Sequence, residues 1–114
     1  QIPDELSNDR LVLIEGQNHT FVDFSKIIRI EGSGSYSDFF MINGDRITTS
    51  KRLNFYWEKL KNLNFIRPHQ SHIANIKHVL KYNRTDGDEL YLINKHRIPV
   101  STRLRQATKI KLGI

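Results

Sequence analysis

The sequence contains no cysteine, a single methionine, two alanines and three prolines, and it has no long apolar run. Without cysteine there is neither a disulfide framework nor a cysteine-ligated metal, and this usage fits a reducing compartment. No apolar run approaches the roughly 18 residues of a membrane span, and no signal peptide opens the chain. We therefore expect a cytoplasmic protein. Because the first residue is Gln1 and the one methionine is Met41, we also expect a piece of a longer protein.

The apolar residues are rich in β-branched side chains and poor in alanine, with 14 isoleucines and 4 valines in the chain. β-branched side chains pack well on a pleated surface and lose rotamers in a helix, so this composition favours β structure. A chain of 114 residues makes one domain, or two small subdomains, and buries about 65% of its unfolded surface. The core is therefore expected to be modest.

Charge is unevenly distributed along the chain. The formal net charge is +6, but residues 1–50 carry a net charge of −4 and residues 51–114 a net charge of +10. A basic half of this kind indicates a polyanionic partner, with nucleic acid first and an anionic membrane surface second. Basic residues that serve solubility alone are the simpler explanation of the same charge.

Apolar alternation and turn residues predict a series of short strands. The expected strands lie at 11–14, 21–22, 25–32, 38–43, 46–50, 76–83, 89–94 and 97–100, and residues 32–37 are expected to form a loop. Asn43-Gly44 is the strongest hairpin signal because it supplies the positive φ angles of a tight turn. Pro68 lacks a backbone donor and disfavours helix before it, so segment 65–75 is expected to be a turn or an edge segment.

Two short helices are expected among these strands. Leu53, Tyr56, Trp57 and Leu60 fall on one face of segment 50–60, and Ser50 is the expected cap. Ser101 is the expected cap of a second helix at 101–112. Its predicted inward residues are Leu104 and Ala107, and its predicted outward residues are Arg103, Arg105, Lys109 and Lys111. The predicted fold class is therefore mainly β with two short helices.

Catalytic and metal-binding patterns are missing from the chain. No G-x-S-x-G, H-E-x-x-H or Walker-type sequence occurs, and the acidic residues are scattered over turns, so we expect no enzyme and no cofactor. Among five histidines, His69 and His72 are three residues apart. On an extended segment that spacing places two side chains on opposite faces, so we expect no metal site.

Two regions are suited to touching a nucleic acid. The small-residue stretch Gly32-Ser33-Gly34-Ser35 would allow close approach of another molecule, although it serves equally well as a plain connection. In the basic half, Gln70 follows Pro68 closely and Arg103 precedes the last helix. Arginine bonds two acceptors of guanine in the major groove and glutamine pairs with adenine, whereas serine, tyrosine and lysine hold phosphates without reading sequence.

The order of several motifs along positions 11–112 also resembles that of one family. The marks are Glu31 before the small-residue loop and Tyr36, the amphipathic helix, Phe65-x-Arg67-x-His69-x-Ser71 with Asn75, and Ile98-Pro99-Val100-Ser101 followed by Arg103. This order closely resembles the LytTR family of bacterial DNA-binding domains. The resemblance implies short antiparallel strands in small packed sheets, and loops that enter successive major grooves of duplex DNA.

The resemblance also implies roles for individual residues. The positions that contact bases correspond to Ser37, Gln70 and Arg103. The positions expected on the DNA backbone are Ser35, Tyr36, Arg67, His69, Ser71, Ser101 and Arg105. Ser37 is short, and Gln70 stands where many members carry arginine or asparagine, so the base preferred at these two positions does not follow from the family.

Family members usually follow a receiver domain or membrane-spanning segments and bind paired direct repeats. We accordingly predict a linker end or disordered terminus at 1–9, a DNA-binding domain at 10–114, and a receiver or membrane domain before it. The predicted function is sequence-specific binding of promoter direct repeats by two copies, as the output domain of a bacterial two-component response regulator.

Two other readings remain open. A membrane-surface module would use the basic helix 101–112, although that helix has few large apolar residues. An RNA-binding module would stack bases on exposed aromatic residues such as Tyr36, Tyr82 or Tyr91.

Overall fold

The computed structural model describes residues 10–114, so the linker predicted at 1–9 lies outside the described residues. Strands dominate these residues, as the composition predicts. The strands are β1 (Arg10–Glu15), β2 (Asn18–Asp23), β3 (Ile27–Ser33), β4 (Tyr36–Met41), β5 (Arg46–Thr49), β6 (Phe65–His69), β7 (His72–Asn75), β8 (Val79–Asn83), β9 (Glu89–Leu92) and β10 (Arg97–Pro99). The helices are α2 (Leu53–Leu60) and α3 (Arg105–Leu112), with 3₁₀ turns η1 (Phe24–Lys26), η2 (Ile76–His78) and η3 (Thr102–Leu104).

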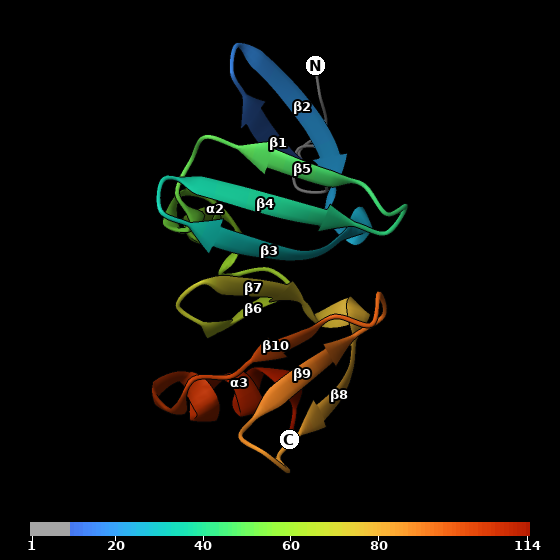
Figure 1. The fold of residues 1–114 in the computed structure, drawn as a ribbon, viewed down its shortest axis with the longest axis vertical. Coiled ribbons are helices and arrows are strands. Elements are labelled where there is room, and N and C mark those ends of the chain that lie inside the picture. The colour runs from blue at the N-terminus through green and yellow to red at the C-terminus, as the bar shows by residue number, and fades with distance from the viewer. Residues whose placement is uncertain (1–9) are drawn as a thin grey trace.

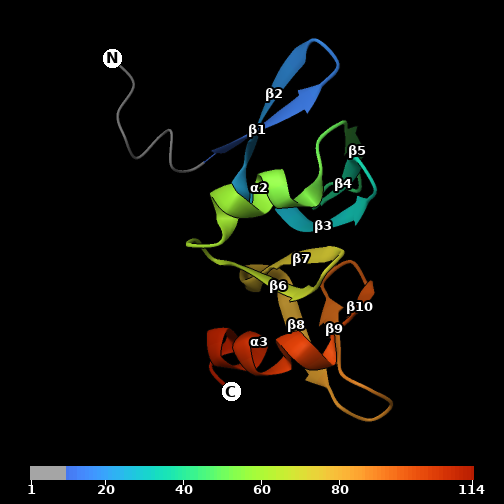
Figure 2. The same cartoon turned by 90° about the vertical axis from the view of Figure 1, so that its left-hand side faces the viewer.

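The strands form three antiparallel sheets that follow one another along the long axis of the molecule (Figure 1 and Figure 2). The first is the β1–β2 hairpin, the second has the order β5-β4-β3-β7-β6, and the third has the order β10-β9-β8. The described residues measure 47 × 29 × 25 Å along the principal axes. The predicted fold class, short antiparallel strands in small packed sheets with two short helices, is confirmed.

The β3–β7–β6 half of the central sheet is covered on both faces. Successive side chains of a strand point to opposite faces, so adjacent residues enter different cores. Ile27, Phe65 and Ile73 pack with β1 and α2 in one cluster, whereas their neighbours Ile28, Ile66 and Ala74 pack with β9 and β10 in the other. This explains why strands β3, β6 and β7 contain consecutive apolar residues rather than a strict alternation.

Helix α2 packs on β3 at a glycine. A Cβ atom on Gly32 would lie 2.8 Å from Cβ of Leu53, so only glycine permits this approach. The helix buries Leu53, Tyr56 and Leu60, as its periodicity predicts. The predicted cap at Ser50 is wrong, because the helix begins at Leu53 and its first turn receives no side-chain cap.

The C-terminal segment begins with η3, and α3 follows from Arg105. Ser101 is the N-cap residue of η3, as predicted, but its side chain makes no capping hydrogen bond. Thr108 is the buried residue of α3, whereas Ala107 is exposed. The ammonium of Lys111, predicted to point outward, donates to the carbonyl oxygens of Lys61 (2.8 Å) and Phe65 (2.5 Å). This lysine therefore ties α3 to the start of β6.

Segment 65–75, expected as a turn or an edge segment, forms the edge strand β6 and its partner β7. Pro68 lies where the pairing shifts between Ile66 and His69, so its missing donor interrupts no regular ladder bond. The loop expected at 32–37 is shorter than predicted, because β3 continues to Ser33 and β4 begins at Tyr36.

Candidate nucleic-acid interface

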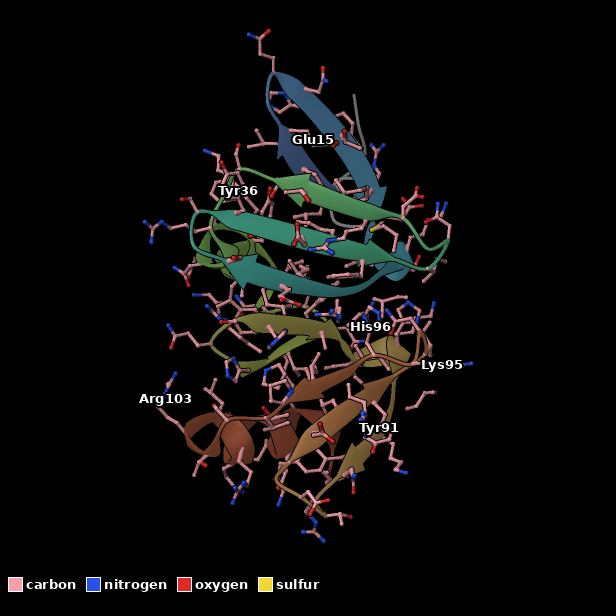
Figure 3. All side chains as sticks on the ribbon, viewed as in Figure 1. Glu15, Tyr36, Tyr91, Lys95, His96 and Arg103 are labelled. Atoms are coloured by element: carbon pink, nitrogen blue, oxygen red, sulfur yellow. The ribbon has the colours of Figure 1, made fainter. Side chains whose placement is uncertain are left out.

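Three short segments lie along one edge of the molecule: the β3–β4 turn at residues 34–35, the β6–β7 turn at residues 70–71, and η3. This edge is on the left in Figure 1, and Arg103 projects from it in Figure 3. Antiparallel pairing of β3 with β7 sets Glu31 opposite His72 and so places the first two turns side by side. Gln70, Arg103 and the Ser35–Tyr36 pair, far apart in sequence, thus share one edge.

Two backbone hydrogen bonds join these segments. The N–H of Gly32 donates to the carbonyl of Ser71 (2.9 Å), which links the first turn to the second. The N–H of Ser101 donates to the carbonyl of Pro68 (2.9 Å), which links β6 to the residue before η3. Because backbone atoms make both links, the spacing of the three segments is set by the fold.

Arg67 holds the β6–β7 turn in shape. Its Nη2 and Nε donate to the carbonyl oxygen of Gln70 at 2.8 and 3.3 Å, and its Nη1 donates to Oδ1 of Asn54 at 3.1 Å. Burial lowers the pKa of Arg67, and the positive charge of Arg103 lowers it further. Two guanidinium groups therefore sit near one another, and among residues 10–114 neither has a carboxylate within salt-bridge distance. Such uncompensated charge favours an anion at this edge.

A groove of about 290 Å³ runs between the first two turns and the start of α2. Its lining residues are Gly32, Gly34, Arg52, Leu53, Asn54, Arg67, Gln70 and Ser71. Arg52 and Asn54 line this groove and were not predicted from the sequence. The adjacent Lys51-Arg52 pair at the start of a helix was the available signal, but only the packing of α2 on Gly32 brings it to the turns.

The predicted site residues differ in accessibility. Ser35, Gln70 and Arg103 are exposed, and Tyr36 is 55% exposed. Arg67, Ser71 and Ser101 are half-buried, and Oγ of Ser101 has no hydrogen-bond partner among the described residues.

Ser37 is placed inside the fold, and this placement argues against the base contact that the resemblance implies there. Its side chain is 0% exposed, its Oγ donates to the carbonyl of Lys51 (2.7 Å), and Oγ1 of Thr49 donates to its carbonyl (3.3 Å). Alternation along β4 turns Tyr36 outward and Ser37 inward. A base contact by Ser37 does not fit this placement, whereas Tyr36 stands free at the edge.

His69 and His72 face one another, which overturns the expectation of opposite faces. They are paired across the two-residue β6–β7 turn, with ring centroids 5.3 Å apart. Nδ1 of His69 accepts from the N–H of Ser71 (3.0 Å), so this ring supports the turn. Burial lowers the pKa of His72 to about 4. No cluster of three or more metal-ligating side chains occurs among residues 10–114.

Arg105 is engaged within the fold rather than at the edge. Its Nε lies 3.0 Å from Oδ2 of Asp88, and the same carboxyl oxygen accepts from the hydroxyl of Tyr82. The backbone contact expected for Arg105 does not fit this ion pair. The basic side chains left at the edge are those of Arg52, Arg67 and Arg103.

Small antiparallel sheets that present three turns on one edge, with arginines that form no salt bridge among residues 10–114, define a domain suited to binding nucleic acid. A family model of the LytTr DNA-binding domain matches residues 17–113, and the chain belongs to this family. A similar solved structure is the LytTr DNA-binding domain of a methyl-accepting/DNA response regulator from Bacillus cereus. It is 25% identical with a TM-score of 0.73, and the match covers 93% of this chain and 98% of that one.

Comparison with curated protein sequences gave no match. The family is defined by DNA binding and not by catalysis, in line with the expectation of a non-enzyme. Within the part of the chain that the structure describes, neither helix has the length and apolar character of a membrane span.

Proposed function

We propose that residues 10–114 form the sequence-specific DNA-reading output domain of a transcriptional regulator. The observation that carries this proposal is the alignment of the Ser35, Gln70 and Arg103 segments on one edge, joined by the Gly32–Ser71 and Ser101–Pro68 backbone bonds. Turns spaced along one edge can enter neighbouring major grooves, each of which exposes a distinct donor and acceptor pattern for every base pair.

Gln70 and Arg103 are the proposed base-reading residues. Both side chains are exposed, and the backbone beneath each is fixed, by Arg67 for the β6–β7 turn and by the Ser101–Pro68 bond for η3. Glutamine offers the bidentate amide that pairs with adenine, and arginine offers the fork that pairs with guanine. A firmly held backbone allows these side chains to distinguish bases rather than only follow charge.

Contacts with the DNA backbone are assigned to the residues around Gln70 and Arg103. Arg52 and Arg67 contribute charge at the groove, and Ser35, Tyr36, Ser71 and Ser101 contribute hydroxyl groups at the turns. These contacts fix register and carry no sequence information. If one copy neutralises about five phosphates, log K falls against log salt with a slope near −4 to −5.

The wider setting of the domain is proposed from the family. We propose a cytoplasmic bacterial regulator of a two-component system, in which two copies occupy a promoter direct repeat and a receiver or membrane domain precedes the chain. The similarity to a response-regulator domain from Bacillus cereus supports a receiver in that position.

Selection from a random duplex DNA library at physiological salt tests the proposal. Enrichment of paired direct repeats is the expected result. Retention of DNA with no enriched motif would show that the chain binds DNA through its positive charge without reading sequence. Stronger retention of single-stranded RNA, or co-sedimentation with anionic liposomes, would favour one of the two other readings.

A further inference from the structure

A second basic surface lies on the three-stranded sheet, away from the edge that carries Arg103. The register of this sheet sets Lys81 and Arg97 on either side of Tyr91, one residue from each strand. We call this cross-strand row the Tyr91 face. Tyr91 lies over β9, Arg103 projects from one edge, and Lys95 projects from the opposite side (Figure 3).

The Tyr91 face is built by contacts among its own residues. The Lys81 ammonium lies 4.8 Å from the Tyr91 ring centroid, and the Arg97 guanidinium carbon lies 5.5 Å from it. The Tyr91 hydroxyl oxygen accepts from Arg97 Nη1 (3.3 Å) and Asn83 Nδ2 (3.1 Å). Both neighbours donate to the oxygen, so the hydroxyl proton is left to donate to another group.

The cations of this region form no salt bridge among residues 10–114. Neither Lys81 nor Arg97 forms a salt bridge among the described residues, although Glu89 lies on the same face one row away. Two more unpaired cations, Lys77 and Lys95, lie at one end of the sheet, where the N–H of Ile93 donates to the carbonyl of His78 (3.1 Å). The region therefore has an excess of positive charge that the fold itself does not neutralise.

Exposed aliphatic residues are close neighbours of these cations in the sequence. Leu80, next to Lys81, is 69% exposed, and Ile93, two residues before Lys95, is 42% exposed. Tyrosine and arginine beside exposed aliphatic side chains are typical of protein interfaces, whereas contact with a phosphodiester backbone needs no aliphatic surface. The composition thus favours a polypeptide over nucleic acid.

We propose that the Tyr91 face docks an acidic polypeptide surface of a partner protein, and that it does so while DNA occupies the Arg103 edge. A carboxylate over the row would accept from Lys81, from Arg97 and from the free Tyr91 hydroxyl proton. Leu80 and Ile93 would pack against apolar residues among the partner's acidic side chains. This docking requires only that DNA bind along the Arg103 edge, and it holds whatever sequence is read there.

The test uses the whole 114-residue chain and a fluorescent peptide in which glutamates are interspersed with leucines. Fluorescence anisotropy is recorded with the protein saturated by duplex DNA, and a peptide with glutamine in place of glutamate reports any uncharged contribution. Lys81→Glu and Arg97→Glu are each expected to weaken the glutamate peptide about tenfold or more, because a like charge replaces an attractive one. Tyr91→Phe is expected to weaken it less.

Lys59→Glu is the matched control. Lys59 is an exposed lysine of α2, so this substitution changes the net charge by the same amount at a site outside the Tyr91 face. The proposal is overturned if the peptide fails to bind the DNA-saturated protein, or if Lys59→Glu weakens it as much as Arg97→Glu. It is also overturned if Lys81→Glu and Arg97→Glu lower DNA affinity well beyond Lys59→Glu, because the face would then contact DNA. The peptide is also titrated into the Arg103→Ala variant in the absence of DNA. Peptide binding that persists there shows that docking at the Tyr91 face does not depend on the reading of DNA sequence by Arg103.

Discussion

Arg67 donates two hydrogen bonds to the backbone carbonyl of Gln70, so a proposed phosphate-binding residue also shapes the turn that carries a proposed base-reading residue. The same guanidinium reaches Asn54 at the start of α2. Positive charge and turn geometry are therefore linked in one side chain. A lysine at this position would keep the charge and lose the fork.

Arg67→Lys is expected to reduce affinity for the selected site more than affinity for scrambled DNA. The charge that serves both DNAs remains, whereas loss of the bonds to Gln70 and Asn54 loosens the turn. The expected loss on the selected site is about 1.5–3 kcal/mol, the range for hydrogen bonds to charged groups. Fluorescence anisotropy on both duplexes measures the difference. An equal loss on the two DNAs would show that Arg67 acts through charge alone.

Arg103 and Arg52 are expected to behave differently when each is replaced by alanine. Arg103→Ala should cost roughly 1–3 kcal/mol on the selected site and relax the sequence preference at one base pair. Arg52→Ala should weaken binding to all duplexes alike and reduce the magnitude of the salt slope by about 1. Titrations at several salt concentrations compare the two variants. Sequence-independent loss for Arg103→Ala would mean that this arginine only binds phosphate.

Ser37→Ala is expected to leave the ratio of specific to non-specific affinity unchanged and to destabilise the fold by about 1 kcal/mol. The Ser37 hydroxyl bonds to the carbonyl of Lys51 inside the protein, so its removal leaves that oxygen without a donor. Urea denaturation measures the stability and anisotropy measures the ratio. Altered base preference with unchanged stability would instead place Ser37 at the DNA.

Acid is expected to destabilise the fold through His72. Burial lowers its pKa to about 4, below its ordinary value of 6.5, so the unfolded chain binds the proton more readily. The free energy of unfolding should therefore fall as pH decreases from about 6.5 to about 4, and this contribution is fully present above that window. His96, whose pKa burial also lowers, acts in the same direction.

Urea denaturation at neutral and at mildly acidic pH compares wild type with His72→Gln. The variant should lose less stability on acidification, because it lacks a group that takes up a proton on unfolding. His19→Gln, at an exposed histidine of β2, is the control and should follow wild type. An identical pH dependence in His72→Gln and wild type would contradict the prediction.

The sequence by itself determined most of the strands, the helical face and the resemblance to the family, whereas strands β6 and β7 were expected only as a turn or an edge segment. Period-two patterns, Asn43-Gly44 and the Leu53–Tyr56–Leu60 spacing are local features, and each is set by the backbone geometry of a few neighbouring residues. The charge difference between the two halves also survives folding, since it depends only on composition. Helix starts were less well predicted, because α2 begins at Leu53 rather than directly after Ser50, and the segment after Ser101 begins as the η3 turn without a side-chain cap.

Only the tertiary structure decided which side chains meet. The register of β3 with β7 brought the turns together, the packing of α2 added Arg52, and one step of alternation along β4 turned Ser37 inward and Tyr36 outward. The tight turn after His69 pairs this residue with His72 on the neighbouring strand, so the two rings lie on the same face, although spacing alone predicted different faces. These outcomes depend on pairing between residues distant in sequence or on an exact turn length, and a shift of one residue in either reverses the face that a side chain occupies.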